Sequence, residues 1–287
     1  MRKGNIIALI IIGIIVIISI VKISYRKNNF EISTFGDIGI VTVEGIIIKS
    51  DKFISQLKRY GKNNSIKGII IVVNSPGGSS ATSQEMFEMV KYVKSKYSKP
   101  IYVSMKSVAA SGGYYIALGA DSIFALPSTM TGSIGVIMDF PEWEKALNKI
   151  GVKMNVIKSG KLKDSGSPYR EFNNSDKEYF QELVNDVYSQ FINDVSNSRN
   201  IPLVEVKKLA KGQVFTGMQA MKNNLIDEIG TTQDVIDIMA GRLNLGANPK
   251  IIKPKKEKIT LIDVLFGDVK NLANIVNNYP ALQTIYK

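Results

Sequence analysis

Short apolar runs alternate along the chain with longer segments in which apolar residues recur at helical spacing. The run Ile69–Val73 is apolar at every position, which is typical of a strand buried on both faces of a sheet. The segment Ser80–Lys96 instead gathers its apolar residues on one side of a helix. Because such strands and helices alternate, the pattern predicts an α/β fold with a mainly parallel sheet.

The predicted elements cover most of the chain between residues 38 and 243. Further strands are predicted at Ile38–Lys49, Pro100–Ser104, Ser122–Ala125, Ile134–Met138 and Lys153–Lys158. Further helices are predicted at Ser111–Gly119, Pro141–Ile150, Ser175–Asn197, Pro202–Lys211, Gly217–Asn223 and Thr232–Leu243, and one begins after Ser50 and Asp51. The segment Pro127–Ser133 is expected to be a turn.

The first part of the chain has a pattern typical of a membrane anchor. Residues 1–5 are basic, and Ile6–Val21 is an uninterrupted apolar run that extends to residue 23 if Lys22 snorkels toward the headgroups. A cleaved signal peptide is the alternative, but its apolar region is usually about 7–15 residues long and ends at a small-x-small site, which is poor here. We therefore predict an uncleaved transmembrane helix at 6–23. Charge does not settle its orientation, because basic residues flank both ends.

These segments set the expected domain organisation. The anchor is followed by a polar linker at 24–37 and by one folded domain at 38–246. The extension at 247–287 is harder to place. Apolar residues between positions 266 and 276 could form a last amphipathic helix, or the tail is mobile.

The composition excludes several kinds of chemistry. The chain has no histidine and no cysteine, so it cannot form a Ser-His-Asp triad, a Cys-His pair, a disulfide or a Cys-ligated zinc site. Its Asp and Glu residues show no clustered pattern for an oxygen-ligated metal. We therefore predict no metal and no cofactor.

The formal net charge is +12, from 37 Lys and Arg against 25 Asp and Glu. The basic residues are spread along the chain, with one cluster at Lys253, Lys255, Lys256 and Lys258. No helix-turn-helix, zinc finger or aromatic RNA-binding motif accompanies them, so nucleic acid is not a predicted partner. A lysine-rich surface, or attraction to anionic lipid headgroups, is the simpler explanation.

Two glycine-rich loops, each after an apolar strand, are candidates for a catalytic site. In Ser75–Gly78 and Ser111–Gly113 the glycines allow backbone N–H groups to approach a ligand closely, as in an oxyanion hole. The simpler interpretation makes the first loop a turn and Ser111 a helix cap. If Ser111 is a nucleophile, its base must be a lysine or a carboxylate, because imidazole is absent.

Ser133, in Thr131–Gly135, is the competing serine, and Lys158, Lys161 and Lys163 are the candidate bases. Each lysine taken alone is more simply explained as a solvated loop residue. A catalytic lysine must be neutral near pH 7, about 3 units below the usual pKa near 10.4, which desolvation in an apolar site can achieve. Spacing alone does not choose among these lysines.

Several motifs, in one fixed order, resemble the bacterial signal peptide peptidase A family in its short, single-domain form. They are Val73–Gly78, Ala109–Tyr115, Thr131–Val136, Lys158–Asp164, Gly212–Gly217 and Leu225–Gly230. The resemblance covers roughly residues 38 to 243, and the apolar segment ahead of it also fits. It implies a Clp protease/crotonase-like fold with a mainly parallel sheet.

The resemblance also implies a role for each matching residue. Ser111 matches the nucleophile and Lys163 matches the general base. Ser133 matches the serine that orients the lysine, and Gly78 and Gly112 match the residues whose amides form the oxyanion hole. In the family the serine and the lysine come from neighbouring subunits, which implies a homo-oligomer.

The implied function is a membrane-anchored serine endopeptidase that degrades hydrophobic peptides, such as signal-peptide remnants, on the outer face of the cytoplasmic membrane. Two alternatives stay open: a crotonase-like acyl-CoA enzyme, and a non-catalytic membrane scaffold of the same fold. One departure from the family pattern is Lys106, where relatives often have a small residue. An extra cation five residues before Ser111 could alter access or lower the pKa of the base.

Overall fold

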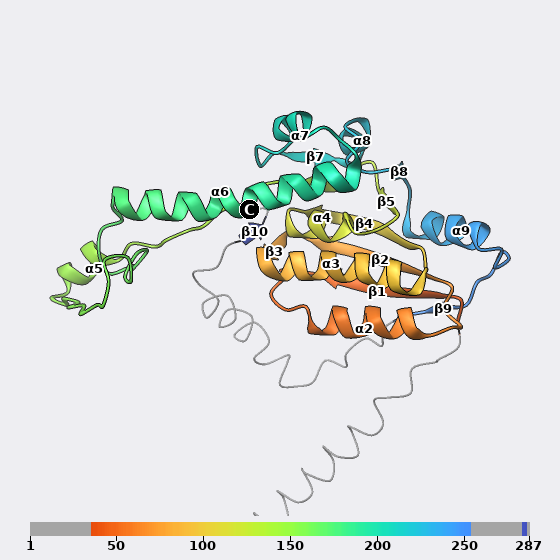
Figure 1. Cartoon of the computed structure of the whole chain (residues 1–287), viewed down its shortest axis with the longest axis horizontal. Coiled ribbons are helices and arrows are strands. Elements are labelled where there is room, and N and C mark those ends of the chain that lie inside the picture. The colour runs from red at the N-terminus through yellow and green to blue at the C-terminus, as the bar shows by residue number, and fades with distance from the viewer. Residues whose placement is uncertain (1–35, 254–282, 286–287) are drawn as a thin grey trace, which may run out of the picture.

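The computed structural model of the chain describes residues 36–253 and 283–285, and a mainly parallel sheet lies at its centre (Figure 1). In order across the sheet the strands are β7 (Val214–Thr216), β6 (Met130–Gly132), β4 (Ile101–Ala110), β2 (Gly68–Ser75), β1 (Ile38–Glu44) and β9 (Ile251–Ile252), with β5 (Ser122–Ala125) beside β4 and β8 (Glu228–Ile229) beside β5. β6 and β7 pair antiparallel, and the other pairs of this sheet are parallel. The predicted α/β class is confirmed.

Helices cover both faces of the sheet. The described helices are α2 (Asp51–Lys62), α3 (Ser80–Tyr97), α4 (Gly112–Ala117), α5 (Glu144–Lys149), α6 (Asn174–Arg199), α7 (Leu203–Leu209), α8 (Gly217–Lys222) and α9 (Thr232–Arg242), of which α5 lies away from the sheet (Figure 1). Ile69 and Ile71 of β2 belong to the core cluster that also contains residues of α2, α3 and α4, whereas Ile70 and Val72 belong to the cluster under α9. Successive side chains of a strand point to opposite faces, so a strand that is apolar at every position is buried by helices on both sides.

One part of the molecule extends away from the sheet. We call it the arm: residues 136–173, which include α5, together with the first part of α6 (Figure 1). The last part of α6 packs on the core through Phe191, Ile192 and Val195, whereas Asp176 is the one buried residue in its first part. Residues 149–163 are all exposed. The arm therefore presents much of its surface to solvent in a single chain.

Two predicted strands are wrong. Ile134–Met138 contains no strand, because the strand that pairs with β4 lies earlier, at Met130–Gly132, within the predicted turn. Lys153–Lys158 lies on the exposed arm without a neighbouring strand to hydrogen-bond with. Apolar residues at these positions do not make a strand, because a strand is stable only as part of a sheet.

Sequence patterning also missed the short strands β7, β8 and β9, which are only two or three residues long. A further pair lies outside the main sheet: β3 (Gly77–Ser79) pairs antiparallel with β10 (Gln283–Ile285). Within the described ranges, no helix is long and apolar enough to cross a membrane. The predicted anchor at 6–23 and the helix expected between 266 and 276 lie outside these ranges.

Candidate active site

Ser111 sits in a strained turn between β4 and α4. Its backbone has φ 54° and ψ −116°, a conformation rarely adopted by a residue with a side chain. Its amide donates to the carbonyl of Gly132 at 2.7 Å, and its carbonyl accepts from the amide of Tyr115 at 2.9 Å. The turn is therefore fixed by backbone bonds to β6 and to the first turn of α4.

The hydroxyl of Ser111 is buried and makes no hydrogen bond to the described residues. The residue is 1% exposed, and its Oγ has no hydrogen-bond partner among the described residues. It makes no capping bond to α4, so the interpretation of Ser111 as a helix cap is wrong. A buried hydroxyl without a partner costs free energy, on the order of 1–3 kcal/mol, which points to a group that has a partner in the functional state.

Ser133 follows the neighbouring strand at the same edge of the sheet. Ala110 of β4 pairs in register with Gly132 of β6, so Ser111 and Ser133 are the next residues after a strand pair. Ser133 also has a positive φ, 49°, and is 7% exposed. The fold therefore brings the two predicted serines together.

The glycine loop after β2 reaches the same edge. Ile47 binds one side of β3: its amide donates to the carbonyl of Gly77 at 2.8 Å, and its carbonyl accepts from the amide of Ser79 at 2.8 Å. The amide of Gly78 points the other way, because alternate residues of an extended strand bond to opposite sides. A Cβ at Gly78 would lie 2.0 Å from the carbonyl oxygen of Ile47, so only glycine fits.

α4 is packed directly against this loop. A Cβ at Gly113 would lie 2.9 Å from the carbonyl oxygen of Ser75. The Ser75 hydroxyl accepts from the amide of Gly77 at 3.1 Å and donates to the carbonyl of Gly45 at 2.6 Å, which fixes the loop. Gly78 and Gly112, the two predicted oxyanion-hole residues, thus lie on two segments that meet beside Ser111.

Lys163 is not part of this group in a single chain. It lies on the arm, between α5 and α6, and its side chain is exposed. Lys161 is also exposed, and Lys158 donates to Asp164 Oδ1 at 2.6 Å. Since Ser111 Oγ has no partner, none of the three candidate lysines is bonded to it.

An ion-pair network that sequence analysis missed holds the segment around Lys163. Arg170 contacts Asp164, at 3.2 Å from Nε to Oδ2, and Asp176, at 2.8 Å from Nη2 to Oδ1. The hydrogen bonds from Arg170 hold the pKa of Asp176 at about 2, although burial opposes this. The hydrogen bond from Lys158 is the main cause that lowers the pKa of Asp164. Asp176 also caps α6 by accepting from the amide of Asn173 at 3.2 Å.

A second missed group connects the arm helix to the nucleophile turn. Tyr115 of α4 stacks on Phe191 of α6 with ring centroids 4.3 Å apart, and its hydroxyl donates to Asp194. Burial and the bond to Asp194 both raise the pKa of Tyr115. Tyr115 and Asp194 are 79 positions apart in the chain, whereas the ion pairs of the arm join residues six positions apart, a spacing outside the helical i,i+3 and i,i+4 patterns.

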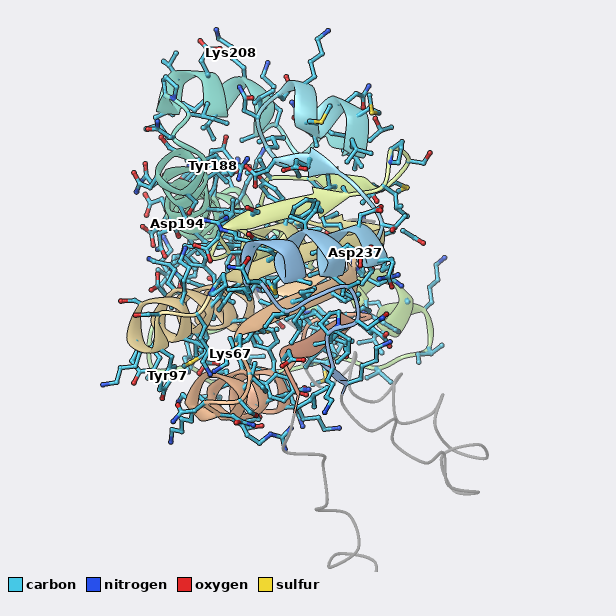
Figure 2. All side chains as sticks on the ribbon, turned by 90° about the vertical axis from the view of Figure 1, so that its right-hand side faces the viewer. Lys67, Tyr97, Tyr188, Asp194, Lys208 and Asp237 are labelled. Atoms are coloured by element: carbon cyan, nitrogen blue, oxygen red, sulfur yellow. The ribbon has the colours of Figure 1, made fainter. Side chains whose placement is uncertain are left out.

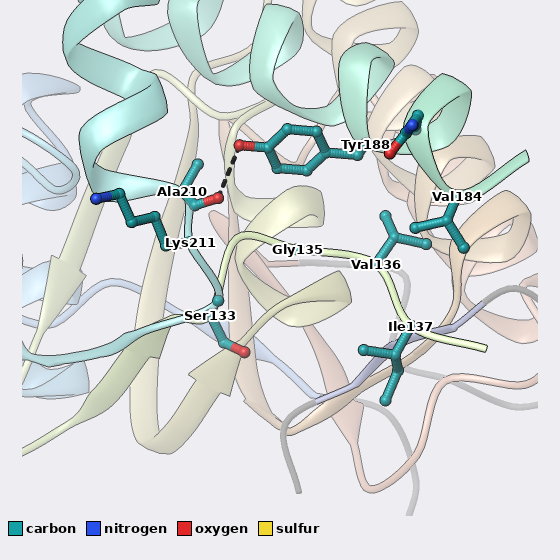
Figure 3. Close-up of a pocket in the computed structure, with 10 residues that line it drawn as sticks. Ser133, Gly135, Val136, Ile137, Val184, Tyr188, Ala210 and Lys211 are labelled. Carbon is teal, nitrogen blue, oxygen red and sulfur yellow. Dashed lines mark hydrogen bonds between the residues drawn. The ribbon is translucent and has the colours of Figure 1, made fainter. Parts of the chain in front are cut away.

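A cavity of about 440 Å³ opens beside Ser133 (Figure 3). Val136 and Ile137 line one side, and Val184 and Tyr188 of α6 line the other. Tyr188 closes one end by donating to the carbonyl of Ala210 at 2.8 Å. The cavity leaves space next to the Ser133 hydroxyl that a side chain from outside this chain can enter.

No metal centre is found in the described part of the chain, where no three Asp or Glu residues come together as ligands. The prediction of no metal rests on the sequence, which has neither histidine nor cysteine.

The mainly parallel sheet with helices on both faces has a Clp protease-like fold, and the buried, strained Ser111 at its edge is a candidate nucleophile. Comparison with known families agrees: the family model "Peptidase family S49" matches residues 94–246, and the model "Clp protease" matches residues 39–139. The chain belongs to peptidase family S49, and the resemblance to signal peptide peptidase A is confirmed.

Individual relatives support the same assignment. "Putative signal peptide peptidase SppA" of Enterococcus faecium is 42% identical over 185 residues, which cover 64% of this chain and 54% of that protein. A "Putative protease" of Synechocystis sp. is 33% identical over 257 residues, which cover 90% and 89%. "Serine protease SPPA, chloroplastic" of Arabidopsis thaliana is 31% identical over 232 residues, which cover 80% and 34%. The chain thus spans about half of the Enterococcus protein, and these names support serine endopeptidase activity.

Proposed function

We propose that the chain is a membrane-anchored serine endopeptidase that cleaves hydrophobic peptides, such as signal-peptide remnants, with Ser111 as nucleophile and Lys163 as general base. The observation that carries this proposal is the buried Ser111 hydroxyl, which has no partner among the described residues and lies beside Ser133 and the glycine loop. Such a hydroxyl is positioned for attack and lacks only a base.

The reaction follows from this arrangement. Ser111 Oγ attacks the scissile carbonyl carbon while its proton passes to Lys163 Nζ. The amides of Gly78 and Gly112 donate to the tetrahedral oxyanion, each such donor contributing about 3 kcal/mol to transition-state stabilisation. The C–N bond then breaks, and the proton moves from Nζ to the leaving amine. Water, activated by the same lysine, hydrolyses the acyl-enzyme ester.

The base comes from a second copy of the chain. Ser111 is buried at the sheet edge, whereas Lys163 is exposed on the arm. In a homo-oligomer the arm of one subunit places Lys163 in the cavity beside Ser133 of its neighbour, where the Ser133 hydroxyl accepts from Nζ and orients it. Removal from water then favours the neutral amine that a base requires.

The peptide substrate binds beside β3 in the place that β10 occupies in this structure, so β10 has to leave before the substrate binds. The pairing of β10 with β3, Thr284 opposite Gly78, supports this, because it places an extended segment antiparallel to the loop that supplies the oxyanion hole. Recognition through backbone hydrogen bonds makes affinity depend little on side-chain identity. This suits an enzyme that degrades varied hydrophobic peptides.

The decisive experiment is subunit complementation with the full chain. Ser111→Ala and Lys163→Ala should each abolish cleavage of a hydrophobic peptide, because the first removes the nucleophile and the second removes the general base from every active site. Mixed oligomers of the two variants should regain part of the activity, since serine from one subunit then meets lysine from the other. Lys161→Ala, on the same exposed loop, is the control and should retain activity.

Activity retained in purified Lys163→Ala would mean that another base is used. If the two inactive variants assemble together but do not recover activity, the proposal of an active site shared between subunits is wrong.

The proposed location of the domain outside the cytoplasm has its own test. Protease added to intact cells should digest residues 28–287, and protection of this region would place the domain in the cytoplasm.

A further inference from the structure

Cations gather at the edge of the sheet opposite the active site. Parallel strands start at this edge, and the helices α2, α3 and α9 end there. We call it the basic edge: the exposed residues Arg59, Lys62, Lys67, Lys96, Lys250 and Lys253. Figure 2 shows Lys67 low in the molecule, near the label of Tyr97 of α3.

Backbone contacts hold these segments together. The amide of Lys67 donates to the carbonyl of Asp37 at 2.7 Å, and the amide of Asp37 donates to the carbonyl of Lys250 at 2.7 Å. Lys99 connects α3 to α2, because its Nζ donates to the carbonyl of Tyr60 at 2.9 Å. Burial is the main cause that lowers the pKa of Lys99 to about 8, with Lys67 adding to it.

The carboxylates at this edge offset only part of its positive charge. Asp121 is paired with Lys94 at 3.6 Å, a lysine outside the six. Asp37 Oδ2 accepts from the amide of Lys250 at 2.8 Å, which is a backbone group. The edge therefore keeps a strong positive potential.

Helix dipoles explain only part of this charge. Arg59, Lys62 and Lys96 lie in the last turns of α2 and α3, where cations are favourable in any protein. Lys67, Lys250 and Lys253 are outside helices and gain nothing from a dipole. Their presence on the same edge calls for an anionic partner.

The course of the chain identifies that partner. Gly36, the first described residue, lies against Ile252 at this edge, since a Cβ there would meet its side chain at 2.5 Å. In the sequence, residues 22–35 separate this point from the apolar run Ile6–Val21. A fully extended segment of that length reaches at most about 50 Å, so the anchor keeps the basic edge within that distance of the membrane surface, and the positive charge decides which side faces the lipid.

We propose that the basic edge docks on anionic phospholipid headgroups. The inference rests on the proposed membrane anchor and deepens the proposed function, because it fixes the orientation of the enzyme. β4 runs from the basic edge, at Ile101, to Ala110, next to Ser111. At about 3.3 Å per residue, the active site then lies roughly 30 Å above the headgroups. Its substrates are therefore peptides that have already left the bilayer.

The test uses the full chain in vesicles and takes advantage of the absence of cysteine. Ser95→Cys places one fluorophore at an exposed position of α3 next to the basic edge, and Glu182→Cys places one at an exposed position of α6 on the arm, away from the sheet (Figure 1), as the control. Nitroxide headgroup lipids report proximity by quenching. We expect the label at 95 to be quenched at least about two-fold more in phosphatidylglycerol-containing vesicles than in pure phosphatidylcholine, with the difference lost at about 0.5 M salt.

Matched variants separate the basic edge from net charge. Lys62→Gln, Lys67→Gln and Lys96→Gln together should abolish the difference, whereas Lys177→Gln, Lys207→Gln and Lys222→Gln, three exposed lysines elsewhere, should leave it unchanged. Equal quenching in both kinds of vesicle, or equal effects of both triple variants, would overturn the proposal. A different result, in which the chain fails to co-float with any vesicle, would refute the anchor itself.

Discussion

At the residue scale, the backbone at Ser111 determines what its side chain can do. A positive φ turns the chain sharply between β4 and α4 and leaves Oγ at the end of the strand, rather than in a capping bond. Such strain costs on the order of 1–3 kcal/mol and persists only when the surroundings hold it. Here the amide of Ser111 is held by Gly132 and its carbonyl by Tyr115.

At Gly78, adding a single methyl group should strongly lower the activity. Gly78→Ala brings a Cβ to 2.0 Å from the carbonyl oxygen of Ile47, so β3 must shift and its amide with it. Losing one oxyanion-hole donor lowers kcat by about 10²–10³-fold. We expect a loss of at least about 10²-fold in kcat for peptide cleavage with the oligomer still assembled, measured by steady-state kinetics.

The control is Gly241→Ala in α9, where the added Cβ meets no described atom within 4 Å apart from its chain neighbours and the backbone of its own helix. Alanine is the better helix former, so this variant should keep full activity and gain up to about 1 kcal/mol of stability. Equal activity losses in the two variants would contradict the role of Gly78.

The sequence identifies residues whose backbone has to adopt an unusual conformation, but it does not identify which side chains contact each other in the fold. The glycines beside Ser75 and Ser111 mark both loops directly, because few other residues tolerate such turns. Spacing left three lysines as candidate bases, and only the family resemblance selected Lys163. Arg170 was missed, because its two carboxylate partners become neighbours only when the arm folds.

At the element scale, the arm is held by charge more than by a core. Arg170 bridges the segment that carries Lys163 to the first turn of α6, where Asp176 is 2% exposed. A nearby cluster of Phe140, Phe172 and Phe180 adds apolar contact. If Lys163 must reach a neighbouring subunit accurately, this small folded unit has to be stable without the sheet.

The Arg170–Asp176 pair gives the arm a predictable acid sensitivity. The pKa of Asp176 is held at about 2, below its usual value, so the pair stabilises the arm above about pH 4 and this contribution is lost as the pH falls toward 2. The expected loss is on the order of 2 kcal/mol of unfolding free energy. The chain has one tryptophan, Trp143, whose amide donates to the carbonyl of Pro168, so its fluorescence in urea reports arm unfolding.

Asp176→Asn should lack this contribution already at pH 7, so its stability should fall less steeply toward pH 2 than that of the unmodified chain, with Asp164 as the acid-sensitive group that remains in the network. Asp186→Asn, an exposed carboxylate on the same helix, should behave like the unmodified chain. The same pH slope in Asp176→Asn and the unmodified chain would mean that the acid sensitivity has another source.

Element prediction succeeded where length and periodicity were strong. The long helix α6 and the buried strand β2 were recognised because each repeats one pattern over many residues. Lys153–Lys158 looked similar to a strand, but the exposed arm gives it no neighbour to pair with. β7 and β8 are strands only because they pair with β6 and β5. These partners lie elsewhere in the sequence, so a local pattern of apolar residues does not reveal the pairing.

At the scale of the whole molecule, the exposed apolar residues of the arm are the surface on which the proposed assembly depends. Ile157 is 102% exposed, Trp143 55%, Val156 54% and Met154 50%, all in one segment. Isolated apolar residues on a surface are ordinary, but a cluster of this kind marks an interface. The sequence pattern predicted Met154, Val156 and Ile157 as part of a strand and Trp143 as part of a helix, and their exposure follows from their position on the arm.

If the arm docks on a neighbour, then assembly and catalysis should fail together. Ile157→Asp and Val156→Asp should each weaken the oligomer, because a carboxylate would be buried in the interface, and activity should fall in proportion to the loss of assembled particles. Analytical ultracentrifugation and peptide cleavage, measured on the same detergent-solubilised full chain, give both quantities. Val204→Asp, at a 66% exposed position on α7, is the matched control and should change neither. A dissociated Ile157→Asp variant with full activity would show that one chain supplies its own base, and the shared active site would have to be abandoned.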